Sequence, residues 1–184
     1  YKIWETGEIT STQKLSEEDR CSLALVLSLK GHSDSEDILM RQLSEIENPD
    51  RRKKFEFLIP SVSADQEVRD SFFEKLKDPL NREREPWVIE GLGYLHHPIR
   101  ASASVKYIRE SLEMLEEVKQ TGDIFFPANW VGTILSGHNS AEAYEIVRSF
   151  LESHPSYPDD LRLKILQTSD NLFRANESKR QTAL

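Results

Sequence analysis

Short apolar stripes follow one another along the whole chain, and residues that begin or end helices separate them. Within a stripe, apolar side chains recur every three or four residues, which places them on one face of a helix. The most regular stripe consists of Val105, Ile108, Leu112, Leu115 and Val118. The pairs Asn48-Pro49 and Asp78-Pro79 have the form of an N-cap followed by a first-turn proline. The pattern predicts about nine helices and no strand, and therefore an all-α fold.

Helices joined by short turns predict antiparallel helical hairpins, stacked as a superhelix of the HEAT or armadillo kind. An internal echo favours stacking, because segments 48–58 and 78–88 align with matching prolines and with Arg52 opposite Arg82. The helical-repeat domain is expected at 15–175. Residues 1–14 are interpreted as a linker or the end of a preceding region, and 176–184 as a flexible tail. The last three residues, 182–184, have the form of a ligand for a PDZ-type carboxylate pocket.

Composition and charge narrow the classes of partner. Of the 184 residues, 38% are hydrophobic and only seven are glycine, as expected of helices with one solvated face. The net charge of −8 argues against nucleic-acid binding, which needs clustered Lys and Arg, and the basic run at 51–54 is expected to fan around a helix. No membrane span is expected, since no apolar run approaches the roughly 20 residues required. Cys21, the single cysteine, is expected to be a small buried hydrophobe.

The adjacent histidines His96 and His97 are the first candidates for chemistry. Consecutive residues on a helix point about 100° apart, so the two cannot address one metal ion from a regular helix. Pro98 disfavours helical backbone for His97, and the pair is predicted to span a helix end and a turn. The other histidines are His32, His138 and His154. Each lies beside a glycine or a proline, and they are interpreted as helix-end residues with a structural role, not as parts of one site. No catalytic, cofactor-binding or metal-binding residue is predicted.

The stretch TGDIFFPANWVG at 121–132 departs from this pattern, because three large aromatic side chains flank a proline where a helix begins. One interpretation is core packing with a hydrophobic staple across the helix start. The other is an aromatic surface beside a helix N-terminus, whose free amides favour an anionic ligand. The candidate contact residues are Asp123, Phe125, Phe126, Asn129 and Trp130.

Four longer stretches of the chain carry a family resemblance. They are, in order, FEFLIPSVSADQEVRDSFFEKLKDP, EPWVIEGLGYLHHPIR, LEEVKQTGDIFFPANW and LRLKILQTSDNLFRA. Together they resemble the C-terminal helical domain of bacterial zinc aminopeptidases of the aminopeptidase N type, and the resemblance runs from about Leu15 to Ala175. In that family a preceding thermolysin-like domain holds zinc and carries the His-Glu-x-x-His and Gly-x-Met-Glu-Asn motifs. Neither motif occurs here, so no catalytic residue is carried over.

The resemblance implies a non-catalytic domain that encloses the active-site chamber of a parent zinc aminopeptidase and controls the access of peptides. Alone, the chain is expected to bind no zinc and to hydrolyse nothing. Its partners would be the catalytic domain of the same parent chain, which holds the zinc, and peptide substrates. For the parent, a periplasmic location is favoured over a cytoplasmic one.

A loop of the family marks the place where substrate contacts are expected. In the related leukotriene hydrolase branch, a Gly-Arg-x-Lys-Phe stretch in this domain reaches the substrate's carboxylate. Here Gly122 and Phe126 match it loosely, whereas the Arg and Lys are absent, so carboxylate anchoring is not carried over. The alternative to the whole assignment is a free-standing HEAT-like adaptor that binds protein partners on a concave surface.

Overall fold

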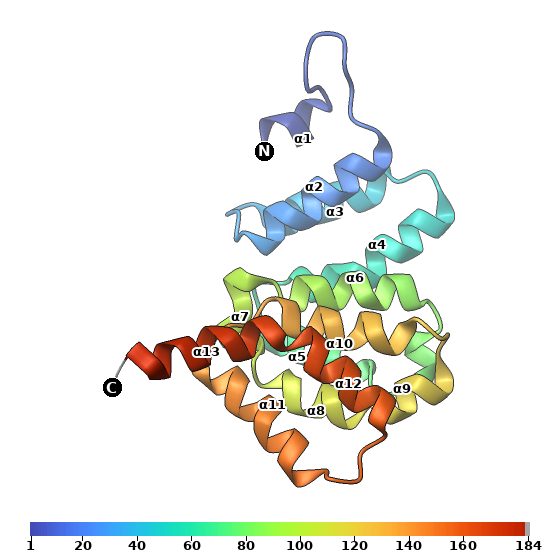
Figure 1. Cartoon of the computed structure of the whole chain (residues 1–184). Helices are drawn as coiled ribbons and strands as arrows, with labels where there is room; N and C mark the ends of the chain where they lie inside the picture. Colours follow the sequence, from blue (N-terminus) through green and yellow to red (C-terminus); the bar gives the residue numbers. More distant parts are fainter. Residues whose placement is uncertain (183–184) are drawn as a thin grey trace. The chain divides into compact units, whose positions relative to one another are not determined.

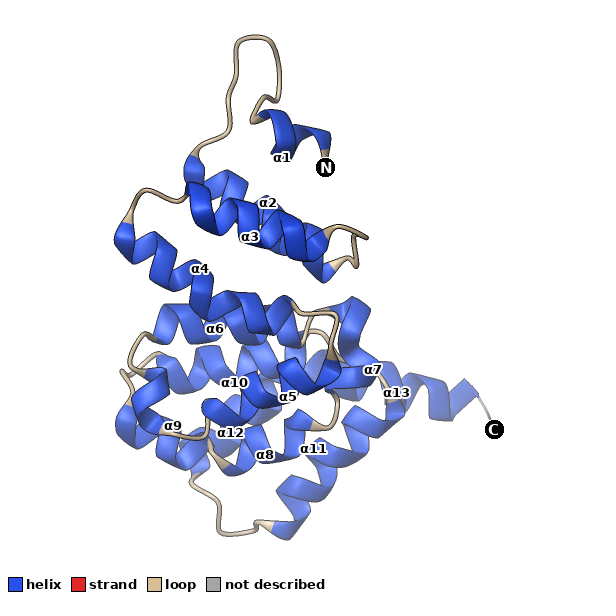
Figure 2. Cartoon of the chain, turned by 180° about the vertical axis from the view of Figure 1, so that it is seen from behind, coloured by secondary structure: helices blue, strands red, loops and turns tan. Residues whose placement is uncertain are grey.

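Helices form the fold of residues 1–182, which the computed structural model describes, with side chains as far as Asn176 (Figures 1 and 2). The all-α prediction is confirmed: within these residues the only strand-like pairing is an isolated bridge between Glu8 and Lys14. The predicted number of nine helices is wrong. The helices are α1 (Lys2–Thr6), α2 (Glu17–Leu29), α3 (Ser35–Glu45), α4 (Pro49–Val62), α5 (Gln66–Lys75), the 3-10 helix η1 (Pro79–Arg82), α6 (Glu85–Leu95), the 3-10 helix η2 (Pro98–Arg100), α7 (Ala101–Ser104), α8 (Tyr107–Glu113), α9 (Leu115–Thr121), α10 (Phe126–Ser136), α11 (Ala141–Ser153), α12 (Asp159–Thr168) and α13 (Asp170–Thr182).

The count differs partly because short helices such as α1 and α7 were not predicted, and partly because continuous apolar stripes are divided between two helices. The stripe from Val105 to Val118 is buried along its length, as predicted, but α8 ends and α9 begins at Met114. The last stripe is divided at the buried Ser169, whose hydroxyl donates to the Ile165 carbonyl at 2.7 Å. A side chain that bonds to the backbone one turn earlier bends a helix. Apolar spacing therefore identified the buried faces but not these breaks.

The two predicted end segments contain helical structure. Helix α1 lies within 1–14, and its Trp4 is buried and donates from Nε1 to Gln42 Oε1 of α3 at 2.8 Å. At the other end, α13 runs through the start of the predicted tail as far as Thr182. Residues 183–184, and with them the end of the predicted PDZ-type motif, lie outside the described residues.

The chain divides into two compact units, Tyr1–Phe72 and Phe73–Leu184. In the first unit, α2 packs on both α3 and α4. Helices α2 and α4 run parallel, because contacts join both their beginnings and their ends. Glu17, the first residue of α2, accepts the Glu47 amide just before α4 at 3.0 Å. Near the other end, the Ser28 hydroxyl donates to the carbonyl of Val62, the last residue of α4, at 3.2 Å.

The second unit has two layers, one of α6, α10 and α12 and the other of α8, α11 and α13 (Figure 1). Small residues let the helices of the first layer pack closely. A Cβ added at Gly93 of α6 would lie 3.9 Å from the Thr133 methyl group of α10, and one at Gly132 of α10 would lie 3.8 Å from the Thr168 methyl group of α12. The same glycine-to-threonine contact therefore recurs at both interfaces of the layer.

The echo between 48–58 and 78–88 is limited to the helix starts. The Asn48 and Asp78 side chains both accept amides of the following turn, as their N-cap form predicts. Counted from the proline, however, α4 has 14 residues, whereas η1 has only four. Arg52 is exposed and Arg82 is buried. The structural repeat is instead that of α6 and α10, which begin about 40 residues apart, a period of the HEAT kind.

Candidate functional site

The 122–125 loop joins α9 to α10, and its backbone is held in place by two carboxylates. The Asp123 amide donates to Glu85 Oε1 of α6 at 2.8 Å. Asp123 Oδ1 accepts the amides of Phe125 and Phe126 at 2.7 and 2.8 Å, which satisfies two donors at the start of α10. A Cβ at Gly122 would lie 2.3 Å from Phe126 Cδ1 and 2.9 Å from Glu85 Oε1. Glycine is therefore required where the loop passes between these side chains.

This fixed loop presents apolar side chains to solvent. Ile124 is 83% exposed and Phe125 is 66% exposed. The next residues turn inward: Phe126 and Trp130 are buried, with ring centroids 5.8 Å apart, and Trp130 Nε1 donates to the Ser111 carbonyl of α8 at 3.0 Å. The aromatic stretch is thus partly core, at Phe126 and Trp130, and partly surface, at Phe125, and the Phe125 and Phe126 amides at the start of α10 are already bonded to Asp123.

The five predicted contact residues separate into two sets. Asp123, Phe125 and Asn129 lie at the surface, whereas Phe126 and Trp130 belong to the core. A substrate contact by the two core residues is inconsistent with their burial. Ile124, the most exposed large apolar side chain in the described part of the chain, was missed because the prediction considered aromatic and polar residues only.

A small groove of about 200 Å³ lies beside Ile124. Its lining residues are Lys119, Gly122, Asp123, Ile124, Pro127, Asp160, Leu161 and Lys164. The apolar part comes from the loop and from the first turns of α10 and α12, and the charged part from Asp123 of the loop and from α9 and α12. Lys119 Nζ donates to Asp160 Oδ1 at 2.9 Å, and this contact lowers the pKa of the Asp160 carboxyl. The groove thus combines apolar walls with charges of both signs.

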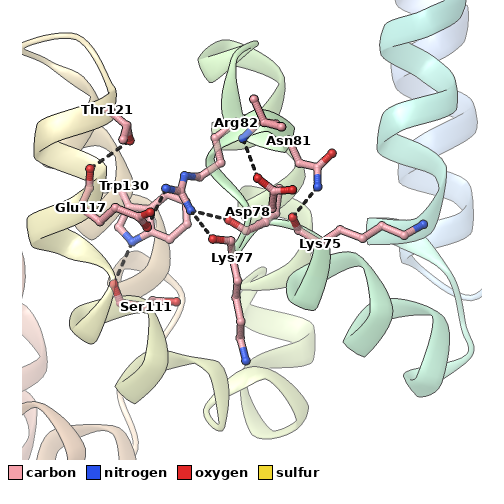
Figure 3. Close-up of polar contacts among 11 residues, drawn as sticks. Lys75, Lys77, Asp78, Asn81, Arg82, Ser111, Glu117, Thr121 and Trp130 are labelled. Carbon is pink, nitrogen blue, oxygen red and sulfur yellow. Dashed lines mark hydrogen bonds and ion pairs between the residues drawn. The ribbon is translucent and has the colours of Figure 1, made fainter.

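Buried polar contacts anchor the helices on either side of the loop (Figure 3). Arg82, whose side chain is 2% exposed, donates to the carbonyls of Leu76 and Lys77 just after α5 and to Glu117 Oε2 of α9 at 2.9 Å. The Thr121 hydroxyl at the end of α9 donates to the Glu117 carbonyl. A buried cation so paired is costly to disturb, and it ties α9 to the end of α5.

His96 and His97 lie where predicted, at the end of α6 and the start of η2. His97 Nδ1 accepts the Ile99 amide at 3.3 Å. His138 follows the end of α10, as predicted, but it is not separate from the other histidines, because its Nε2 lies 2.9 Å from His96 Nδ1 in a buried hydrogen bond. The two rings come from the ends of α6 and α10, and only the fold brings them together.

Burial controls the proton affinity of this histidine pair. It lowers the pKa of His96 to about 3, with a smaller contribution from His138, and it lowers the pKa of His138 to about 4. Both rings are therefore neutral at pH 7. Each has a second buried nitrogen, His96 Nε2 and His138 Nδ1, without a hydrogen-bond partner among the described residues.

Three further observations complete the description of the site. In the described part of the chain, no three His, Cys, Asp or Glu side chains are grouped as ligands for a metal ion. None of the described helices is long and apolar enough to cross a membrane. Comparison with known proteins finds no family model, no curated protein and no solved structure that matches this chain.

Proposed function

We propose that this chain is a non-catalytic helical domain of an aminopeptidase N-type zinc enzyme, and that its 122–125 loop contacts peptides entering the catalytic chamber. The observation that carries the proposal is the exposure of Ile124 and Phe125 on a loop held by hydrogen bonds. Burying such a side chain contributes about 1.5–3 kcal/mol. A fixed loop that leaves two of them in water is typical of a contact surface.

Two features support the proposal that the loop contacts a peptide. The resemblance of the chain to the aminopeptidase domain includes this loop, in the stretch LEEVKQTGDIFFPANW. The neighbouring groove offers Pro127 and Leu161 to an apolar side chain and Lys119, Asp160 and Lys164 to polar backbone groups. Mixed linings of this kind suit peptides better than purely apolar ligands.

In this proposal the domain acts through binding and access, while the zinc and the bond-breaking groups belong to the catalytic domain of the parent chain. A peptide long enough to reach the loop gains apolar contact that a dipeptide does not. Binding energy from such remote contacts changes KM when it is equal in the ground and transition states, and kcat when it is larger in the transition state.

The test uses the full-length protein that contains this sequence and a series of peptides of increasing length with the same N-terminal residue. The double variant Ile124→Ser/Phe125→Ser is expected to change kcat/KM for long peptides by about 10-fold, which corresponds to about 1.4 kcal/mol, and to leave dipeptides unchanged. Leu80→Ser is the matched control, because Leu80 is 73% exposed but lies on η1 and does not line the groove. An identical effect of both variants, or none at any length, would contradict the proposal.

The adaptor alternative gives a different result in the same preparation. There the exposed pair docks a protein, the full-length protein releases no N-terminal residues from any peptide, and the double variant loses a binding partner that the Leu80→Ser control keeps. The two functions are thus separated by whether peptide turnover exists at all.

A further inference from the structure

The His96–His138 pair is a buried titratable group that the proposed function does not use. The rings are only 1% and 5% exposed, and the one hydrogen bond that they make among the described residues joins them to each other. In the neutral state one ring donates and the other accepts. Because each ring has two nitrogens, this leaves one buried donor and one buried acceptor unpaired, whichever tautomers are present. The pair therefore already leaves buried hydrogen-bonding groups unpaired among the described residues before any proton is added.

Protons make the pair less stable in two steps. The first converts one ring to an imidazolium, which still donates to its neutral partner, and its cost is the burial of a charge. The second turns both facing nitrogens into donors 2.9 Å apart, so that the hydrogen bond is lost and two like charges face each other. Solvent access relieves both costs.

Among the described residues, an aromatic ring rather than a carboxylate borders His96. From α8, Tyr107 meets the His96 ring edge-on at 6.0 Å, and Lys106 Nζ lies 5.2 Å from the Tyr107 ring centroid. Among the described residues, no carboxylate raises the pKa of either histidine.

The backbone around the pair has no room to adjust. A Cβ added at Gly137, between the end of α10 and His138, would lie 1.8 Å from the His96 carbonyl oxygen. The end of α6 therefore rests directly on the end of α10. Separating these two helix ends would let water reach the rings.

We infer that this pair makes the packing of α6 on α10 acid-sensitive: proton uptake by His96 and His138 separates the C-terminal ends of the two helices. The opening is local, since it begins at the helix ends that carry the pair. It stands independently of the proposed function, because it rests only on the geometry of the two rings and of Gly137.

Amide hydrogen exchange on this chain tests the inference. The probes are the amides of His96, bonded to the Leu92 carbonyl, and of His138, bonded to the Leu135 carbonyl, with the Lys30 amide of the first unit as reference. A ring that takes up a proton only when open, with an ordinary pKa near 6.5, raises the opening constant about 20-fold between pH 7 and pH 5. The reference amide is expected to change less than twofold after correction for intrinsic exchange.

The matched variant is His96→Asn/His138→Gln, because the two amides place a polar atom near Nδ1 and Nε2 respectively and do not titrate. It is expected to abolish the pH effect, whereas His97→Asn, which alters the neighbouring histidine outside the pair, keeps it. Should the double variant not fold, NMR titration of the wild-type rings gives the same answer. A change in wild-type opening below fivefold, or a ring that titrates near pH 6.5 in the closed state, overturns the inference.

Discussion

The parallel pairs α2/α4 and α6/α10 are joined alike at their beginnings. In each, the first residue of the leading helix is a glutamate, Glu17 or Glu85, that accepts a backbone amide just ahead of the partner helix. What precedes the partner helix differs. In the first unit the turn before α4 is polar, whereas in the second unit it presents Ile124 and Phe125 to solvent. The same glutamate-to-amide hydrogen bond therefore only joins two helices in the first unit, whereas in the second unit it also holds a loop with exposed apolar side chains.

At their far ends the two pairs are joined by different chemistry. The first uses the Ser28 hydroxyl and the Val62 carbonyl, and the second uses His96 and His138. A hydroxyl keeps its protonation state at every pH at which proteins are handled, whereas imidazole does not. The comparison teaches that one helix arrangement can be indifferent or sensitive to acid, depending on which side chains close its far end.

Among the substitutions, Gly137→Ala is expected to have the largest effect, because its Cβ would lie 1.8 Å from a backbone oxygen that cannot swing aside. The free energy of unfolding should fall by about 3 kcal/mol, the upper range for overpacking. Gly132→Ala is the control: its Cβ would meet Thr168 at an ordinary 3.8 Å, and alanine is favoured in a helix by about 1 kcal/mol. Urea unfolding measures the free energy of unfolding of both variants. Equal values would mean that the C-terminal ends of α6 and α10 are not in close contact.

Acid should lower the free energy of unfolding through the two histidines of the α6/α10 pair, because the unfolded chain binds protons more readily than the folded one. The folded-state pKa values of His96 and His138, about 3 and about 4, lie below the unfolded value near 6.5. The unfolded chain therefore binds more protons between these values, and stability is lost as pH falls from about 6.5 toward 4. From pH 7 to pH 5 the loss is about 2 kcal/mol for each ring that stays neutral. A urea series should show this loss in the wild type but not in His96→Asn/His138→Gln, and a loss that persists in the variant would assign it to other groups.

Ser28→Ala tests the first pair in the same assay. The change leaves the Val62 carbonyl without this donor in a buried position, at a cost of about 1 kcal/mol. The cost should be equal at pH 7 and pH 5, since no titrating group is removed. A cost that grows with acidity would remove the distinction between the two pairs.

Substitution of the two glutamates that accept the amides ahead of α4 and α10 should change the free energy of unfolding least. Glutamine retains an oxygen acceptor, so Glu17→Gln and Glu85→Gln should each cost about 0.5 kcal/mol. The cost for Glu17 should be slightly the larger, because it also loses a solvent-screened ion pair with Arg51. The reverse order in urea unfolding would show that the ion pair contributes nothing.

The sequence predicted what local spacing determines. The buried stripes, the caps at Asn48 and Asp78 and the helix end at His96 were all visible, because each depends on residues within one or two turns. One local signal was overlooked. Arg69 donates to the carbonyls of Ser63 and Ala64, which lie six and five residues earlier in the chain. Arg82 donates in the same way to the carbonyls of Leu76 and Lys77. Each arginine thus binds the backbone just after the preceding helix.

Features that depend on the packing of distant helices were not predictable from spacing. The pairing of His96 with His138 joins residues 42 positions apart, and no periodicity links them. The loop is a second case. Phe125 and Phe126 are adjacent and chemically identical, yet one faces solvent and the other the core, because Asp123 and Gly122 set the direction of the chain at that point.

The most direct test of the functional proposal is a zinc-dependence assay on the full-length protein that contains this sequence. Metal content is measured together with release of N-terminal residues from a panel of aminoacyl chromogenic substrates, before and after chelation and after zinc is restored. The proposal predicts bound zinc and turnover that chelation abolishes and zinc restores. A protein that binds no zinc and releases no N-terminal residue would contradict the aminopeptidase assignment and leave the 122–125 loop as a docking surface for another protein.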